Sequence, residues 1–226
     1  MRKIIAIILL FILSFAVLSS ISKIPFGISK TKVGKYYINN GIEQTGAVNI
    51  ITSVVLNYRG MDTLGEVTVL FIGAIGLMAI LSTITRKTEK KFTPSSSILS
   101  TGCKFLFPFI LLFGSYIFLN GHLSPGGGFQ GGAIIASAFL LKYLGCYEKR
   151  INEKKFKVAE SLGGLVFILI GISGLIAGGY FLFNFLPKGT AGTLLSGGII
   201  PIIYIAIGFK VGAEISGIID NLMEES

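Results

Sequence analysis

Long apolar runs constrain this chain more than any other feature of its sequence. A helix of about 20 apolar residues is long enough to cross a hydrocarbon core about 30 Å thick. Only 14% of the 226 residues are charged, whereas soluble chains carry about 25%. The sequence therefore predicts an all-α, polytopic bundle of about six transmembrane helices, within a range of five to seven. The apolar runs cover residues 4–22, 64–84, 98–119, 131–145, 158–186 and 191–218.

Three segments leave the number of helices open. Residues 131–145 reach a full span only if the Gly-rich stretch before them joins the helix. Residues 47–58 would form a helix about 18 Å long, which is re-entrant, interfacial or part of a longer helix that starts near Gly41. Run 4–22 has the layout of a secretory signal, but we interpret it as a first transmembrane helix.

The basic residues between these runs indicate the orientation. Segments 86–91 and 149–157 are rich in Lys and Arg, whereas segment 120–132 carries no Asp, Glu, Lys or Arg. Basic loops stay in the cytoplasm, so both termini are expected there, although the lysines of 23–45 then face outside. The net charge of +9 thus reflects membrane topology, and nucleic-acid binding is not expected.

A composition typical of a turn, Thr-Pro followed by three serines, occupies residues 93–97. It predicts a seam between two modules, residues 1–92 and 93–226.

The block YRGMDTLGE, residues 58–66, places charges at the mouth of an apolar run. One interpretation is a helix start, with Thr63 as the N-cap and Glu66 completing a capping box. The other is that Glu66 lies within the membrane and handles a proton or a sodium ion, because ionisable groups there are costly and usually functional. The two roles are compatible. Asp62 and Arg59 are further candidates for ion translocation.

A Gly-rich stretch, residues 120–132, separates two apolar runs. It lacks the Lys-Ser/Thr pair of a phosphate-binding loop, and no strand is expected before it. We expect irregular backbone buried in protein, where glycines let helices or an ion approach, and Pro125 blocks the preceding helix. His122 is either a proton relay or an interfacial histidine bonded to a backbone carbonyl. The glycines of this loop are Gly126, Gly127, Gly128, Gly131 and Gly132.

Small residues four positions apart let helix backbones pack closely. This spacing predicts helix packing at Gly174 and Gly178 and at Gly208 and Gly212.

Charged residues also stand near the ends of several apolar runs. Lys210 and Glu214 are four apart and can pair, while Glu160 suits the start of its helix. Lys104 can extend to the cytoplasmic interface. We interpret these charges as structural or interfacial, with Lys210 as the candidate for ion translocation.

Metal and redox chemistry find little support in this sequence. Cys103 and Cys146 are far apart, no CxxC pair exists, and His122 is the only histidine. This argues against an iron–sulfur cluster, a structural zinc site or a haem ligand pair. Because no nucleophile–base pair or cofactor loop is visible either, we expect neither an enzyme nor a bound cofactor.

Two parts of the chain resemble known families. GHLSPGGGFQGG at 121–132 and AGTLLSGGIIPIIYIAIGFKVGAEIS at 191–216 closely resemble the B-subunit domain, MnhB, of Mrp-type multisubunit sodium/proton antiporters. GAVNIITSVVLNYRGMDTLGEVTVLFI at 46–72 resembles the C-terminal stretch of the large A subunit, and its small stand-alone counterpart in membrane-bound hydrogenases. The chain looks like a fusion of two subunits that are often separate.

The resemblance implies a helical membrane module held among other subunits of an Mrp-type antiporter or a hydrogenase-like complex. It implies the cell membrane of a bacterium or archaeon, Na⁺ and H⁺ as transported ions, and no redox cofactor on this chain. The acidic residue of the family's DTLGE block maps onto Glu66 and its loop histidine onto His122, while Asn57 stands where the family often has Asp. The alternative is a purely structural linker that bridges antiporter-like and redox subunits without carrying ions.

Overall fold

The computed structural model describes residues 2–23, 31–81, 95–145 and 153–225. Within these ranges the fold is all-α, as predicted, and contains no strand. The helices are α1 (Arg2–Ser22), α2 (Lys32–Thr45), α3 (Ile50–Ser53), the π-helix η1 (Val54–Tyr58), α4 (Gly60–Leu81), α5 (Ser97–Leu119), α6 (Gly128–Gly145), α7 (Glu153–Gly178) and α8 (Ile200–Glu225).

The chain divides into two compact units, Met1–Lys35 and Tyr36–Ser226. The first contains α1, and the second contains α3 to α8. The predicted seam at 93–94 and the basic residues 86–91 and 149–150 lie outside the described residues.

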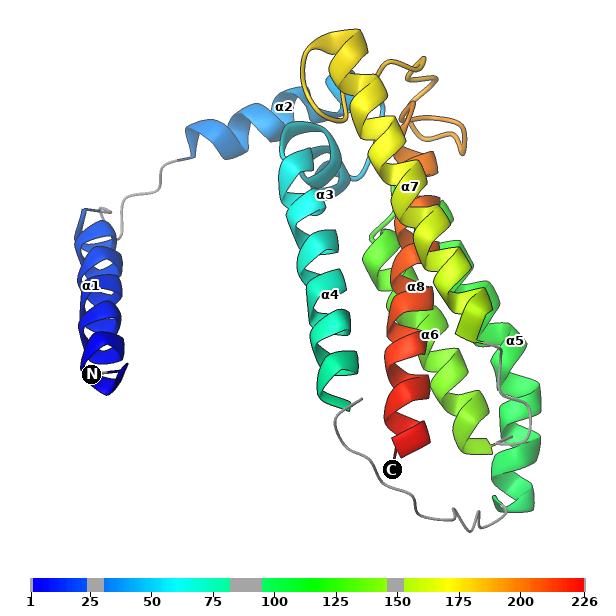
Figure 1. Ribbon diagram of the computed structural model, residues 1–226. Coiled ribbons are helices and arrows are strands. Elements are labelled where there is room, and N and C mark those ends of the chain that lie inside the picture. Colours follow the sequence, from blue (N-terminus) through cyan, green and yellow to red (C-terminus); the bar gives the residue numbers. More distant parts are fainter. Residues whose placement is uncertain (1, 24–30, 82–94, 146–152, 226) are drawn as a thin grey trace. The chain divides into compact units, whose positions relative to one another are not determined.

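Helix α8 is the centre of the second unit, because α4, α6 and α7 all pack against it (Figure 1). Of its apolar stretch 61% is buried inside the chain, whereas the corresponding share of α4 is 11%. Most of the α4 surface therefore faces lipid or another subunit. The buried side chains of α8 and the residue before it recur at helical spacing: Ile199, Ile200, Ile203, Ile207 and Val211.

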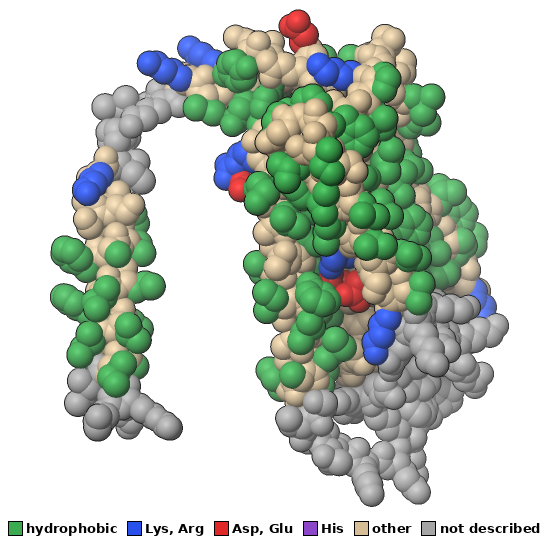
Figure 2. Space-filling view, turned by 45° about the horizontal axis from the view of Figure 1, so that its top comes forward, with side chains coloured by type: hydrophobic (Ala, Val, Ile, Leu, Met, Phe, Trp, Pro, Cys, Tyr) green, Lys and Arg blue, Asp and Glu red, His purple; other side chains and the backbone are tan. Residues whose placement is uncertain are grey.

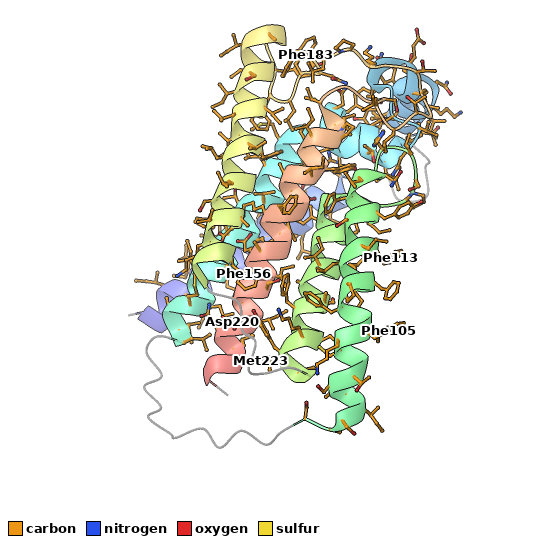
Figure 3. All side chains as sticks on the ribbon, turned by 90° about the vertical axis from the view of Figure 1, so that its right-hand side faces the viewer. Phe105, Phe113, Phe156, Phe183, Asp220 and Met223 are labelled. Carbon is orange, nitrogen blue, oxygen red and sulfur yellow. The ribbon has the colours of Figure 1, made fainter. Side chains whose placement is uncertain are left out.

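Five helices of the described chain are long and apolar enough to cross a membrane: α1, α4, α5, α7 and α8. A sixth, α6, has 18 residues, about 27 Å at a rise of about 1.5 Å per residue. It begins at Gly128, so glycines of the Gly-rich stretch do join the helix. The sequence predicted a full span only under this condition. The exposed Phe105 and Phe113 side chains of α5 point away from the bundle, as expected for a lipid or subunit contact (Figure 3).

Glycines set how closely α6 approaches its neighbours. A Cβ on Gly132 would lie 2.9 Å from both Gly208 O and Gly212 N of α8. On the α5 side, a Cβ on Gly131 would lie 2.7 Å from Gly114 O. Because real Cβ atoms do not approach backbone so closely, only glycine permits these helices to touch.

The ends of two helices differ from the prediction. Helix α7 ends at Gly178 rather than at 186, and α8 begins at Ile200 rather than at 191. The intervening residues are apolar, but Gly179, Gly197 and Gly198 have positive φ angles of 79°, 88° and 60°. Such left-handed residues end a helix, so apolar composition alone overestimated the lengths of both helices.

The predicted loop 23–45 is wrong from Lys32 onward, where α2 forms. Polar residues interrupt this helix, so a search for apolar runs misses it. Residues 47–58 do not span the bundle, because α3 has 4 residues and η1 has 5.

Residues 45–60, 120–128 and 179–199 meet at one end of the second unit, the loop end (Figure 1). Asn184 is central to it. Its Oδ1 accepts a hydrogen bond from Ile199 N at 3.0 Å, and its Nδ2 donates to Gly197 O at 3.0 Å and Thr45 O at 3.4 Å. One amide thus joins three segments at the start of α8.

Candidate functional site

The middle of α8 carries a buried ion pair. Lys210 Nζ lies 2.6 Å from Glu214 Oε2, and the two side chains are only 8% and 1% exposed. The pairing predicted from their spacing is confirmed. Removing two charges from water is costly even when they are paired, and ionisable groups within membrane spans are usually functional. This pair is therefore the strongest candidate for a functional group.

A cavity lies beside this pair, between α4, α7 and α8. Glu160 of α7 lines it together with Glu214, and Glu160 lies within electrostatic range of both Glu214 and Lys210. Lys210 Nζ is 5.4 Å from the ring centroid of Phe71 on α4, a cation–π distance. Figure 2 shows acidic and basic side chains gathered between helices whose surface is largely apolar.

Glycines of α7 make room for the Lys210 side chain. A Cβ on Gly163 would lie 3.0 Å from Lys210 Cβ, and one on Gly164 would lie 3.6 Å from Lys210 Cε. The stem of Lys210 therefore runs along α7. Glu160 stands one turn before Gly164, on the same side of α7, which brings its carboxylate to the cavity where the ammonium ends.

Glu66 lies outside this cluster. It is exposed on α4 in this chain, and helical spacing places it on the opposite flank of the buried face from Phe71. The cavity wall does not include Glu66. In a membrane its carboxylate would meet lipid or another subunit.

The predicted capping box at Thr63 is wrong. Helix α4 already begins at Gly60, so Thr63 lies inside it, and its hydroxyl donates to Val55 O at 2.6 Å. The chain is nearly continuously helical from α3 through η1, which leaves no free N–H group near Thr63 to cap. Arg59 and Asp62 form an exposed ion pair at the start of α4, which contributes little to stability.

His122 is fully buried at the loop end. Its carbonyl oxygen accepts a hydrogen bond from Asn49 N at 3.0 Å, but neither ring nitrogen makes a well-formed hydrogen bond with the described residues. Burial lowers the pKa of His122 below its ordinary value, and the backbone carbonyls of Thr193 and Leu194 oppose this shift. The neutral imidazole is therefore favoured.

The short helix α3 anchors the loop end through buried polar groups. Thr52 Oγ1 is 2.7 Å from both Gly121 O and Tyr204 Oη. Asn49 Nδ2 donates to Gly121 O and Ser124 O at 2.9 and 3.0 Å. These contacts hold the Gly-rich loop against α8. Sequence reasoning missed them because the partners are far apart in the chain.

The glycines predicted to pack helices together contact different neighbours. In α8, a Cβ on Gly208 would meet the Phe118 ring of α5, and one on Gly212 would meet α6. In α7, Gly174 and Gly178 instead face the loop that follows their own helix, at Phe183. Of the Gly-rich stretch, Gly128, Gly131 and Gly132 pack α6 against its neighbours, whereas Pro125, Gly126 and Gly127 form the turn before it.

Sequence reasoning also missed that Glu160 joins the Lys210–Glu214 pair. Glu160 stands near the start of an apolar run, where a charge that only stabilises the helix end is also expected. The run alone therefore could not distinguish such a charge from a member of the cluster. The adjacent Gly163 and Gly164 are the one local signal, since paired glycines mark a close helix contact. Among the described residues, no three His, Cys, Asp or Glu side chains are grouped so as to hold a metal ion.

Two family descriptions match successive parts of the chain. Residues 98–217 match the domain related to the MnhB subunit of Na⁺/H⁺ antiporters. Residues 3–97 match MbhE, the family of the E subunit of MBH.

Individual relatives match the chain as well. An uncharacterized protein of Methanocaldococcus jannaschii is 32% identical over 201 residues, which cover 74% of this chain and 74% of that protein. The B subunit of the Na⁺/H⁺ antiporter of Alkalihalophilus pseudofirmus is 40% identical over 79 residues, 34% of this chain and 55% of that protein. The match thus spans about half the length of the antiporter protein.

Two solved structures share the fold. A chain of the membrane-bound sulfane sulfur reductase, an archaeal respiratory membrane complex, is 49% identical with a TM-score of 0.78, covering 98% of this chain and 97% of that one. A chain of the Mrp complex from Dietzia sp. DQ12-45-1b has a TM-score of 0.72 at 22% identity and covers 98% of this chain but 26% of that one. Both are chains of multisubunit membrane complexes.

Proposed function

Because the chain belongs to the family of domains related to the MnhB subunit of Na⁺/H⁺ antiporters, we propose that it contributes to Na⁺ or H⁺ translocation as a non-redox subunit of a sodium/proton antiporter module. Its partners are other membrane subunits. The module lies in the cell membrane of a bacterium or archaeon, with both termini of this chain in the cytoplasm. Any catalysis by the parent complex takes place on other chains.

One observation carries this proposal: the ion pair of Lys210 and Glu214, buried within a spanning helix beside a cavity. A well-packed apolar pair would serve stability at least as well. Charges retained at this depth are therefore better explained by a task that needs them, such as passing a proton or a sodium ion.

Glu66 provides a second position for ion handling. It is exposed on a helix that is long and apolar enough to cross a membrane. Facing lipid, its charged form would be costly. Contact with a partner subunit that brings a positive charge or a hydrated path removes this cost. Arg59, Asp62 and His122 lie nearer the loop end and would border the entrance of such a path.

The test is transport by the intact complex in sealed vesicles. Glu214→Gln keeps the shape of the side chain and removes its charge, so Na⁺-dependent proton movement should fall at least tenfold while assembly is retained. Glu66→Gln should reduce transport as well. The matched control is Glu43→Gln, a change at an exposed residue of α2, which should leave transport unchanged. Normal transport by an assembled Glu214→Gln complex would refute the assignment.

A purely structural linker is the second candidate, and the glycine contacts of α6 favour it. Much of the Gly-rich stretch is used to pack α6 against α5 and α8. On this view Glu66→Gln and Glu214→Gln are silent, whereas a bulky change at a packing glycine, such as Gly132→Leu, disperses the complex. The set of proteins recovered after mild-detergent purification distinguishes the two candidates.

A further inference from the structure

One carboxylate oxygen beside the cavity makes no hydrogen bond within the described part of the chain. Glu214 is 3% exposed, and its Oε2 accepts the hydrogen bond from Lys210 at 2.6 Å. Its Oε1 is buried and makes no hydrogen bond with any described residue. A buried charged oxygen without a hydrogen bond is unfavourable, so this oxygen is positioned for a ligand.

The adjoining cavity has room for that ligand. Its volume is about 50 Å³, enough for a water molecule or a small ion. Three side chains of its wall offer oxygen: the carboxylates of Glu160 and Glu214 and the amide of Asn221. Hard cations prefer such oxygen ligands.

The charged groups around the cavity indicate what the ligand of this oxygen must offer. Glu160 and Glu214 bring two negative charges to the cavity, and Lys210 brings one positive charge beside it. Helix α4 contributes only apolar side chains to the wall, whereas the exposed Lys157 of α7 also lines it and lies within electrostatic range of Glu160. Lys210 occupies only Oε2 of the buried Glu214. An ionised carboxylate oxygen accepts hydrogen bonds or binds cations, so the ligand of Oε1 is a cation or a hydrogen-bond donor.

We infer that Glu160 and Glu214 bind one Na⁺ in this cavity, and that the ion exchanges with the Lys210 ammonium for the Glu214 carboxylate. This inference rests on the proposed function and names the ion and the site. When Na⁺ occupies the carboxylates, the ammonium turns to the Phe71 ring, already 5.4 Å from Nζ, where a cation–π contact compensates it. Lys210 thus acts as a tethered competitor of the transported ion.

The test measures binding of radioactive Na⁺ to the purified complex, with choline chloride holding the ionic strength constant. Lys210→Met removes the competitor, so half-saturation should occur at a Na⁺ concentration roughly tenfold lower than in the wild type. Glu160→Gln removes one of the two negative charges that attract Na⁺ and should raise that concentration roughly tenfold. Differences between variants isolate this site from Na⁺ bound elsewhere in the complex.

Equal half-saturation in the wild type and Glu160→Gln would overturn the inference. This comparison also decides the matter if Lys210→Met fails to assemble, because Glu160→Gln leaves the buried ion pair in place. Binding of K⁺ as tight as that of Na⁺ would overturn the choice of Na⁺. If no Na⁺ binds and the variants change only the affinity for protons, seen as a pH-dependent signal, the cavity is a proton site. That result would overturn the inference too.

Transport in the same preparations separates this inference from the proposed function. Loss of transport in Glu214→Gln with unchanged Na⁺ binding in every variant refutes the sodium site and leaves the proposed function standing. Unchanged transport in Glu214→Gln refutes the proposed function, whatever the binding result.

Discussion

The two faces of α8 are built on opposite principles. Toward α6, glycines bring backbone against backbone, as at Gly132, where a Cβ would lie 2.9 Å from α8. Toward α4 and α7, the same helix presents Lys210 and Glu214 to a cavity. The first face is close-packed and uncharged, and the second is charged and incompletely filled.

The two faces therefore have different roles: one holds α8 in place, and the other presents its charged side chains. Close-packed contacts have few alternative arrangements, so α6 and α5 hold α8 in place. A cavity with charged walls permits a side chain to change partner at small cost. A membrane helix that must present movable charges therefore benefits from one rigid face and one loose face.

The largest expected effect comes from breaking the charged face on one side only. Lys210→Met leaves the Glu214 carboxylate buried and unpaired, and this should lower the free energy of unfolding by about 3–5 kcal/mol. The double variant Lys210→Met/Glu214→Leu removes both charges and should recover most of that loss. Thermal unfolding of the full chain in mild detergent measures both. A double variant no more stable than the single one would contradict the account.

Overfilling the rigid face should have the next largest effect. Gly132→Val places side-chain atoms against Gly208 O and Gly212 N and should cost about 3 kcal/mol, near the upper end of overpacking. The matched control is Gly73→Val on α4, where a Cβ would meet nothing within 4 Å. The same unfolding measurement applies. If both changes cost the same, the α6 contact is not close-packed.

A smaller effect tests whether the loop end belongs with the rigid face. Thr52→Val removes the hydroxyl that contacts Gly121 O and Tyr204 Oη. Gly121 O keeps the hydrogen bond from Asn49, but the buried Tyr204 hydroxyl loses this partner, which should cost about 1–2 kcal/mol. Thr68→Val is the control, because Thr68 is exposed and bonds only within its own helix. Faster amide hydrogen exchange at residues 121–124 in Thr52→Val alone would localise the loss.

The smallest effect is a pH dependence at His122. Burial lowers its pKa in the folded chain, whereas the unfolded chain titrates near about 6.5. Below that pH the unfolded state binds a proton that the folded state resists, so stability falls as the pH drops through about 6.5 and further, until the lowered pKa is passed. His122→Gln should flatten this part of the profile. Unfolding temperatures of both proteins at pH 8 and pH 5.5 provide the comparison, and parallel profiles would show that His122 is not responsible.

The sequence predicted the key residues on both faces of α8 but not their partners on other helices. Lys210 and Glu214 lie on one helix, so their spacing alone predicted the pair. Gly208 and Gly212 likewise carried a packing signal. Glu160 belongs to another helix, and no pattern along the chain states which helices become neighbours.

Local chemistry misled the prediction at the loop end. Thr63 and Glu66 have the spacing of a capping box, but η1 extends the helical path ahead of them, so there was nothing to cap. A search for apolar runs does not find helix α2, because lysines, asparagines and other polar residues interrupt it. Residues 191–199 were assigned to a helix on apolar content, although the positive φ of Gly197 and Gly198 requires a turn.

The amide of Asn184 fixes the start of α8, so a tilt of the helix about this point moves its distant residues most. It holds the first turn of the helix through Ile199 N and ties that turn to Gly197 and Thr45. Glu214 lies about 22 Å from this pivot along the axis, at about 1.5 Å per residue. A tilt of about 5° at the pivot would move Glu214 by about 2 Å relative to α4 and α7. Lys210 lies on the same helix, so the ion pair would move as a unit against the cavity wall. A small shift in the loop between α7 and α8 is therefore enlarged where the charges are.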